Sequence, residues 1–302
     1  MEAVLEEAAA PSVTTGAASL ARAELLQELL TRPAVAPRAA AAARGPRALR
    51  TVQRLLVALL LLAAALAPMA GIRPFGVGSG PDPVGGAPAV YATVEDLVQE
   101  GTPVLVAFEY GPSEAEEMDW VARPLLGHIL ERGGRIILVS TRPEGPASVE
   151  RILRERVDTE EWSARVANLG YQPGGATGIQ SLLADLTGRP LYPSGEPASG
   201  SQAMEGVASA GDVALVVVLA GQAEDARSWV EQVTARYPDR PLVVGVSARV
   251  EPVVRPYVTE AAGGSVKGIV GGLAGGAAYE ELTGSGTGRA DFYLQSLALA
   301  QW

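Results

Sequence analysis

The sequence predicts an α/β domain with a doubly wound, mainly parallel five-stranded sheet, preceded by one transmembrane helix. Five short runs are apolar throughout, which is typical of strands in a sheet covered on both faces. Each run is followed by a helical pattern, as expected when crossover helices join parallel strands. An uncharged stretch of 18 residues precedes all of them. A sheet of this kind is Rossmann-like or flavodoxin-like.

The composition disfavours several classes of chemistry. The 302-residue chain has no cysteine and one histidine, His128, which argues against disulfides, thiolate nucleophiles, catalytic triads and histidine-rich metal sites. The net charge is −10, and residues 1–54 carry seven arginines against five glutamates. The rest of the chain therefore carries −12, a poor charge for a nucleic-acid partner. We expect no cofactor and no metal site.

The apolar stretch at 55–72, LLVALLLLAAALAPMAGI, is predicted to be the membrane helix. At helical rise it is roughly 27 Å long, enough to cross a hydrocarbon core. A buried helix of a soluble domain would normally have a polar face, which this stretch lacks. A cleaved signal peptide is the stronger alternative, because ALAPMA offers small residues after a leucine core. The long segment before the stretch favours an uncleaved signal-anchor instead.

Flanking arginines predict the orientation of this anchor. Arginines crowd its N-terminal side, whereas Arg73 alone lies close on the other side. The positive-inside rule then makes residues 1–54 a cytoplasmic leader and places the acidic domain outside the cytoplasm. The leader contains a short amphipathic stretch around 20–30. The expected location is the cell membrane, as a single-pass protein.

The remaining elements follow in order along the chain. Residues 73–89 are rich in Gly and Pro and are predicted to be a linker, and 90–302 to be the α/β domain. Apolar runs predict strands at 103–110, 135–141, 213–221, 241–247 and 266–272. Helical patterns predict helices at 114–132, 146–157, 223–237, 251–260 and 274–282. We expect the less regular middle, including LGYQPGGATGIQSLLADL, to end in an exposed loop.

Right-handed crossovers bring every strand's carboxyl end to one edge of the sheet, where open α/β folds bind ligands. The predicted ligand-binding residues are those that end or follow strands. They are Glu109, Tyr110, Ser140, Thr141, Gln222, Ser247, Arg249, Gly271 and Gly272.

Glu109 is the candidate catalytic residue. A carboxylate that ends an apolar strand lies beside low-dielectric walls, which raise its pKa and suit a general base. The alternative is structural, with Glu109 capping a helix or pairing with Arg142 or Arg249.

Other polar groups give weaker signals. The acids at 114, 116, 117 and 119 resemble a metal cluster, but acids in a first helical turn also answer the helix dipole. We expect His128 on a helix, away from the strand ends. Ser140 and Ser247 lack an obvious base, and Lys267, the only lysine, is predicted at the opposite end of the sheet.

Two glycine-rich stretches could cradle phosphate, YQPGGATGIQSLL and KGIVGGLAGGAAYEEL. Neither matches G-x-G-x-x-G, and neither carries the Lys-Ser/Thr of a P-loop. Turns with positive φ and close packing explain these glycines better, because the anion-binding chemistry lacks its cation.

Three stretches carry a resemblance: NLGYQPGGATGI, ARYPDRPLVVGVSARVEPVVRPYV and GIVGGLAGGAAYEELTG. They resemble an uncharacterised family of bacterial and archaeal membrane-anchored proteins over most of residues 90–290. The resemblance supports the predicted topology and implies no activity.

Three functions are compatible with the sequence. The first is a single-pass membrane protein that presents an acidic α/β domain for ligand or partner binding, without catalysis. The second is a membrane-anchored hydrolase or transferase that uses Glu109 with a divalent cation. The third is a structural subunit of a membrane complex. The expected partners are the lipid bilayer, through residues 55–72, and a membrane protein.

Overall fold

The computed structural model describes residues 24, 26–27, 47–66, 86–258 and 266–284. The chain divides into two units at Leu61 and Leu62, so the N-terminal helix and the α/β domain are described separately. Most of the predicted leader and linker lie outside the described residues, as do residues 259–265 and 285–302 of the predicted domain.

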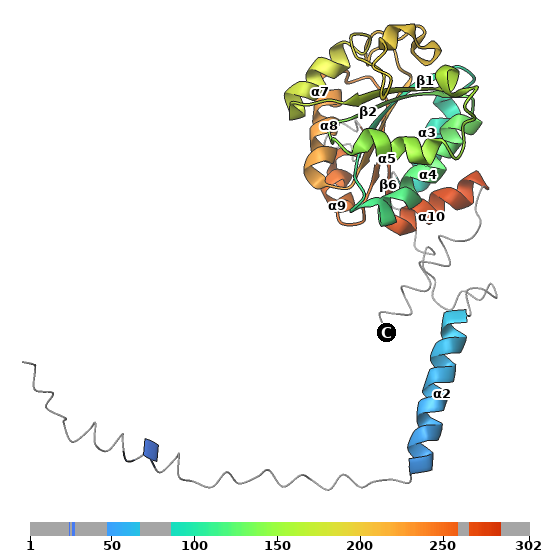
Figure 1. The fold of residues 1–302 in the computed structure, drawn as a ribbon, viewed down its shortest axis with the longest axis vertical. Coiled ribbons are helices and arrows are strands. Elements are labelled where there is room, and N and C mark those ends of the chain that lie inside the picture. The colour runs from blue at the N-terminus through green and yellow to red at the C-terminus, as the bar shows by residue number, and fades with distance from the viewer. Residues whose placement is uncertain (1–23, 25, 28–46, 67–85, 259–265, 285–302) are drawn as a thin grey trace, which may run out of the picture. The chain divides into compact units, whose positions relative to one another are not determined.

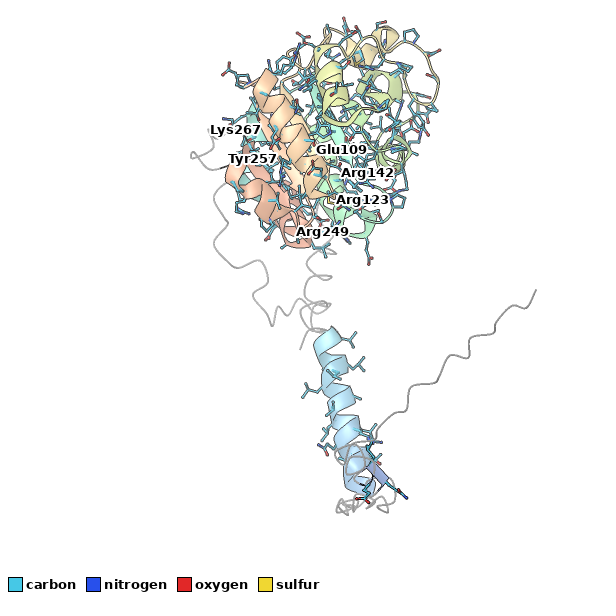
Figure 2. All side chains as sticks on the ribbon, turned by 90° about the vertical axis from the view of Figure 1, so that its left-hand side faces the viewer. Glu109, Arg123, Arg142, Arg249, Tyr257 and Lys267 are labelled. Carbon is cyan, nitrogen blue, oxygen red and sulfur yellow. The ribbon has the colours of Figure 1, made fainter. Side chains whose placement is uncertain are left out.

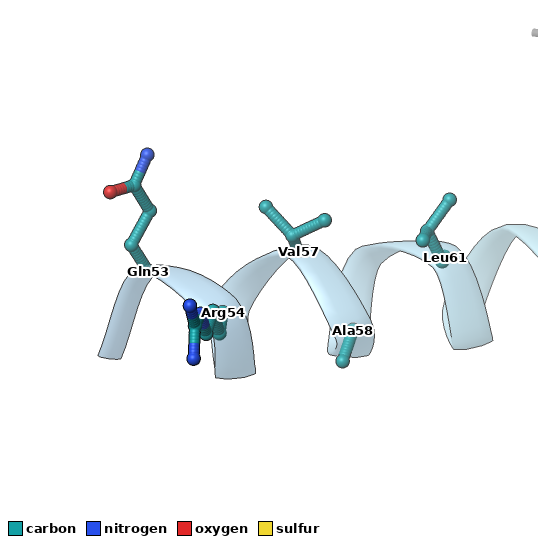
Figure 3. Close-up of a pocket in the computed structure, with 5 residues that line it drawn as sticks. All are labelled: Gln53, Arg54, Val57, Ala58 and Leu61. Atoms are coloured by element: carbon teal, nitrogen blue, oxygen red, sulfur yellow. The ribbon is translucent and has the colours of Figure 1, made fainter. Parts of the chain in front are cut away.

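Helix α2 (Arg47–Leu66) starts before the predicted membrane stretch and contains its first twelve residues. Its leucines from Leu55 onward are exposed, from 70 % at Leu60 to 49 % at Leu66. Figure 3 shows Gln53, Val57 and Leu61 along this helix. No helix among the described residues is both long enough and apolar enough to span a membrane. Residues 67–72 of the predicted span are not among them.

The α/β domain contains a parallel sheet of six strands, not the predicted five (Figure 1). The strands are β1 (Pro103–Glu109), β2 (Arg135–Ser140), β3 (Val166–Tyr171), β4 (Leu215–Ala220), β5 (Leu242–Val246) and β6 (Val266–Gly271). Their order is β3-β2-β1-β4-β5-β6, a Rossmann-like order that reverses between β1 and β4. The additional strand is β3, in the middle segment expected to be irregular.

Helices cover both faces of this sheet. They are α3 (Ala87–Leu97), α4 (Ala115–Glu131), α5 (Gly145–Leu153), α6 (Trp162–Arg165), α7 (Gly175–Ala184), α8 (Ala223–Arg236), α9 (Glu251–Val254) and α10 (Gly272–Thr283). Short 3₁₀ turns occur at Ala198–Gly200, Gln202–Met204 and Arg255–Tyr257. Helix α3 was not predicted, and it begins inside the predicted linker.

The two core clusters explain why the strands are apolar throughout. On β1, Val104, Val106 and Phe108 pack with α3, α4, α5 and α10, while Leu105 and Ala107 pack on the opposite face with α7, α8 and α9. Alternate side chains of a strand point to opposite faces, so both sets must be apolar. Predicted strand and helix bounds otherwise agree with the structure to within a few residues, except that the predicted helix at 251–260 is shorter, as α9 and a 3₁₀ turn.

Because all six strands are parallel, their carboxyl ends lie at one edge of the sheet. Loops leave β1 and β4 toward opposite faces, since α4 packs on one side and α8 on the other. Such a divergence leaves a crevice between the two loops.

Candidate functional site: a charged crevice at the strand ends

A crevice of about 590 Å³ lies at the point where the strand order reverses. Its lining comes from four elements that are far apart in the sequence. The residues are Ser113, Glu114, Glu116, Glu117, Gln222, Ser247, Arg249 and Leu273. Three of the predicted ligand-binding residues therefore line it: Gln222, Ser247 and Arg249. The acids and Leu273 were not predicted as part of this site.

Glu114 connects the two sides of the crevice. One carboxylate oxygen, Oε2, accepts hydrogen bonds from the Gly111 amide (3.2 Å) and the Ser113 hydroxyl (2.7 Å). The other, Oε1, accepts one from Gln222 Nε2 (2.6 Å), across the gap between α4 and α8. Burial acts to raise the pKa of Glu114, but the hydrogen bonds from Ser113, Gln222 and Gly111 hold it below its ordinary value. Glu114 is therefore a fixed negative charge in the crevice.

Glu117 places a second carboxylate on the same wall. Its Oε1 accepts a hydrogen bond from the Ala248 amide (2.8 Å), in the loop that follows β5. The same oxygen faces the turn into α10, 2.9 Å from where a Cβ on Gly272 would stand. Gly272 has φ +56°, a conformation that favours glycine. An acid therefore already lies against the glycine-rich turn that was considered for phosphate.

Arg249 supplies the positive charge. Its Nη2 donates a hydrogen bond to the Gly221 carbonyl (3.2 Å), which also accepts one from the Ser247 hydroxyl (3.2 Å). Within the described part of the chain, Arg249 forms no ion pair with Glu114 or Glu117. Figure 2 marks Arg249, and also Lys267, which lies at the start of β6 and so at the opposite end of the sheet, as predicted.

Glu109 lies beneath this edge and has no exposed surface. Its Oε1 accepts hydrogen bonds from the Thr141 amide (2.7 Å) and Trp229 Nε1 (2.8 Å), and its Oε2 accepts one from the Thr141 hydroxyl (2.7 Å). Burial raises the pKa of Glu109 to about 7, against these hydrogen bonds. The expected rise in pKa is confirmed, but the proposed partners were wrong. Arg142 instead pairs with Glu144 and Asp225.

Three further predicted residues lie in structural contacts away from the crevice. Tyr110 is buried and donates to Asp119 Oδ1 (3.0 Å), and burial raises its pKa well above the usual value. Ser140 is buried and donates to the Phe108 carbonyl (2.6 Å). Thr141 is used by Glu109. Ser140 and Thr141 thus join β2 to β1, and Tyr110 joins the end of β1 to α4.

The glycines at the start of α10 serve packing. Gly271 precedes the helix in an extended conformation, and a Cβ on it would stand 2.0 Å from Glu251 Oε2. A Cβ on Gly276 would stand 2.5 Å from the Trp120 carbonyl oxygen of α4. These contacts confirm the interpretation of KGIVGGLAGGAAYEEL as turn and packing.

The acidic cluster of α4 does not converge. Asp119 faces away from Glu114 and Glu117, toward Arg123 and Arg151. Among the residues described, no group of three or more Asp, Glu or His side chains could hold a metal ion. His128 is buried between helices, 2.8 Å from Glu95 and 2.8 Å from Tyr279.

A second hollow, of about 860 Å³, lies along β3 and the loop around 191–202. It includes Trp162, over which the Arg154 guanidinium stacks at 4.5 Å, and the exposed Tyr192. No sequence pattern pointed to it. It lies at the outer strand of the sheet, away from the reversal of strand order.

The fold and crevice together define a Rossmann-like α/β domain with a charged site at its strand-end edge. Compared with protein-family models and with curated proteins, the chain matches neither.

Proposed function

We propose that the chain is a single-pass membrane-anchored protein whose acidic α/β domain binds a ligand outside the cytoplasm. The crevice at the reversal of strand order supports this proposal, because three of the predicted ligand-binding residues line it, Gln222, Ser247 and Arg249. Ligands of open α/β sheets bind at this position.

Binding is favoured over catalysis by the position of Glu109. The hydrolase or transferase hypothesis requires this carboxyl group to reach a substrate, and Glu109 has no exposed surface. Its carboxyl oxygens are occupied by Thr141 and Trp229. The crevice offers charges and hydrogen-bond donors that can hold a ligand without a reaction. Its lining contains no histidine.

The anchor and the orientation remain predictions from the sequence, and single cysteines test them sharply. Because the chain has no cysteine, an introduced thiol is its sole labelling site. We expect a membrane-impermeant maleimide to label Asp239→Cys, at an exposed turn, in intact cells. Ser12→Cys in the leader should be labelled only after lysis. The protein should also stay with membranes after alkaline washing, and release by this wash would contradict the anchor.

Binding is tested by thermal denaturation of the full-length chain with L-lysine, ATP, maltose and Ca²⁺ as probes. A ligand at a hundred times its dissociation constant stabilises a protein by about 2.7 kcal/mol. For a domain of this size, that shifts the melting temperature by roughly 5–11 °C. A shift caused by L-lysine, ATP or maltose should be lost in Arg249→Gln and kept in Arg227→Gln, which removes the same charge from an exposed site on α8. A shift caused by Ca²⁺ should instead be lost in Glu117→Gln. If none of the four probes shifts the melting temperature, the third function, a structural subunit of a membrane complex, is favoured instead.

A further inference from the structure

The crevice holds opposite charges that do not neutralise one another. Glu114 and Glu117 lie on the α4 side, and Arg249 lies in the loop after β5. In the described residues, neither carboxylate forms an ion pair with the guanidinium. Unpaired opposite charges in one small crevice suit a ligand that carries both signs itself.

Backbone contacts hold these charges in position. The Ala248 amide binds Glu117, and the next residue, Arg249, is held by the Gly221 carbonyl. The loop after β5 therefore fixes one group of each sign. A preset geometry lowers the conformational cost of binding. It also sets the spacing that a ligand must match.

The same geometry disfavours a phosphate ligand. In Rossmann-like domains, the helix after the first strand usually receives a phosphate group at its N-terminus. Here the carboxylate of Glu114 accepts the Gly111 amide, and Glu116 and Glu117 occupy the first turn of α4. A phosphate would meet three negative charges at that place.

We infer that the crevice binds a basic α-amino acid, with the ligand carboxylate on Arg249 and its ammonium groups against Glu117 and Glu114. Guanidinium groups recognise carboxylates through paired N–H donors. The carboxylates of Glu114 and Glu117 outnumber the single guanidinium of Arg249, which favours a ligand with an extra positive charge. This inference rests on the proposed function, because it takes the crevice as the ligand site.

The test compares L-lysine with three analogues that each lack one charge. L-lysine methyl ester lacks the carboxylate charge, 6-aminohexanoate lacks the α-ammonium, and L-norleucine lacks the side-chain ammonium. Titration calorimetry on the full-length chain measures the four affinities. We expect L-lysine to bind, and each analogue to bind about 10- to 100-fold more weakly.

Two substitutions assign the contacts. Arg249→Gln should lower the affinity for L-lysine by about 10- to 100-fold. It should leave the affinity for the methyl ester unchanged, because the ester no longer presents a carboxylate to Arg249. Glu117→Gln keeps an acceptor for the Ala248 amide but should weaken L-lysine. Arg227→Gln and Glu281→Gln change exposed charges outside the crevice and should bind as the parent does. Urea denaturation of each variant checks that the fold is kept.

The outcomes separate this inference from the proposed function. If L-lysine does not bind, or binds equally well to Arg249→Gln, the inference is overturned. Should ATP or maltose then bind to the parent and not to Arg249→Gln, or Ca²⁺ bind to the parent and not to Glu117→Gln, the crevice remains the ligand site for another chemistry. If none of these probes binds, the proposed ligand-binding function fails together with the inference.

Discussion

Glu109 shows how a single buried carboxyl group can be accommodated without a cation. At the end of β1 it accepts hydrogen bonds from Thr141, which follows β2, and from Trp229 of α8. When protonated, it can donate to the Thr141 hydroxyl, whose own proton is free to rotate. Its pKa of about 7, raised by burial, means that both forms occur near neutral pH. Glu109 therefore joins β1, the turn after β2 and α8, and its raised pKa makes the stability of the fold depend on pH.

Replacing Glu109 by glutamine should remove a pH dependence of stability. The folded protein keeps the Glu109 proton up to about pH 7, whereas the ordinary carboxyl pKa is 4.5. The stability present below pH 4.5 is thus lost as the pH rises through about 7, by about 3 kcal/mol. Urea denaturation across this range should show the parent losing stability relative to Glu109→Gln as the pH rises.

The matched control for this prediction is Glu281→Gln, which alters an exposed carboxylate on α10. It should follow the pH dependence of the parent. Parallel curves for the parent and Glu109→Gln would mean that Glu109 does not titrate in this window.

Sequence reasoning found part of the crevice and could not find the rest. The rule that ligands meet strand ends pointed equally to Ser140, Thr141, Ser247 and Arg249. Only the last two line the crevice, because the loop after β5 lies at it and the turn after β2 is used by Glu109. The acids at the start of α4 were interpreted from the sequence as favourable charges at the N-terminus of a helix dipole. That they line the same crevice as Arg249 depends on how distant segments pack, which the sequence pattern does not show.

A polar contact holds three helices together on one face of the sheet. His128 of α4 lies 2.8 Å from the Tyr279 hydroxyl of α10 and 2.8 Å from Glu95 of α3, and Tyr91 stacks on its ring. Tyr279 is completely buried. The hydrogen bond from His128 holds the pKa of Glu95 below its ordinary value. The single histidine is thus a packing residue that connects the first and last helices of the domain.

The stability losses caused by removing His128 and Tyr279 should not add, because each single substitution leaves the other partner buried without its hydrogen bond. His128→Leu leaves the Tyr279 hydroxyl buried without its nitrogen partner, a loss of about 1–3 kcal/mol. The double variant His128→Leu with Tyr279→Phe should recover part of that loss, giving a coupling of about 0.5–3 kcal/mol. Urea denaturation of the parent and the three variants measures it.

Tyr171→Phe removes a hydroxyl from a 46 % exposed tyrosine and is the control for Tyr279→Phe. It should leave stability unchanged. Strict additivity of the two substitutions would show that His128 and Tyr279 do not support one another.

At the scale of whole elements, sequence patterns found five strands and missed β3 and α3, and the predicted helices did not include α6 and α7. Strand β3 contains Asn168 and Gly170, which interrupt its apolar run, and its pairing with β2 shifts register after Leu138. Asn168 is satisfied in the fold by Pro146 and Gly170, contacts that the sequence does not reveal. Helix α3 is short and follows a Gly- and Pro-rich segment, so its two buried valines, Val90 and Val94, were not assigned to any element.

Across the whole domain, the first helix packs against the last strand and the last helix. Gly268 of β6 allows this approach, since a Cβ there would stand 2.7 Å from a methyl group of Val90 on α3. Tyr279 of α10 reaches His128 beside them. One face of the core therefore needs both ends of the domain.

A chain that stops at Gly271, and so lacks α10, should lose at least about 3 kcal/mol of stability. It exposes the surface that buries Tyr279 and leaves His128 without that partner. A chain ending at Gly284 keeps α10 and should be more stable by this amount than the chain ending at Gly271, as measured by thermal and urea denaturation. Equal stability of the two truncated chains would show that α10 contributes little.

The strand order also has a consequence for synthesis on the ribosome. Strand β1 emerges first and becomes a central strand, with β2 and β3 added on one side and β4, β5 and β6 on the other. Most of the sheet can therefore assemble outward as the chain lengthens. Helix α3 emerges before all the strands, yet it must wait for β6 and α10 to cover Val90 and Val94. Until β6 and α10 have left the exit tunnel, the face of α3 that carries Val90 is accessible to chaperones and proteases.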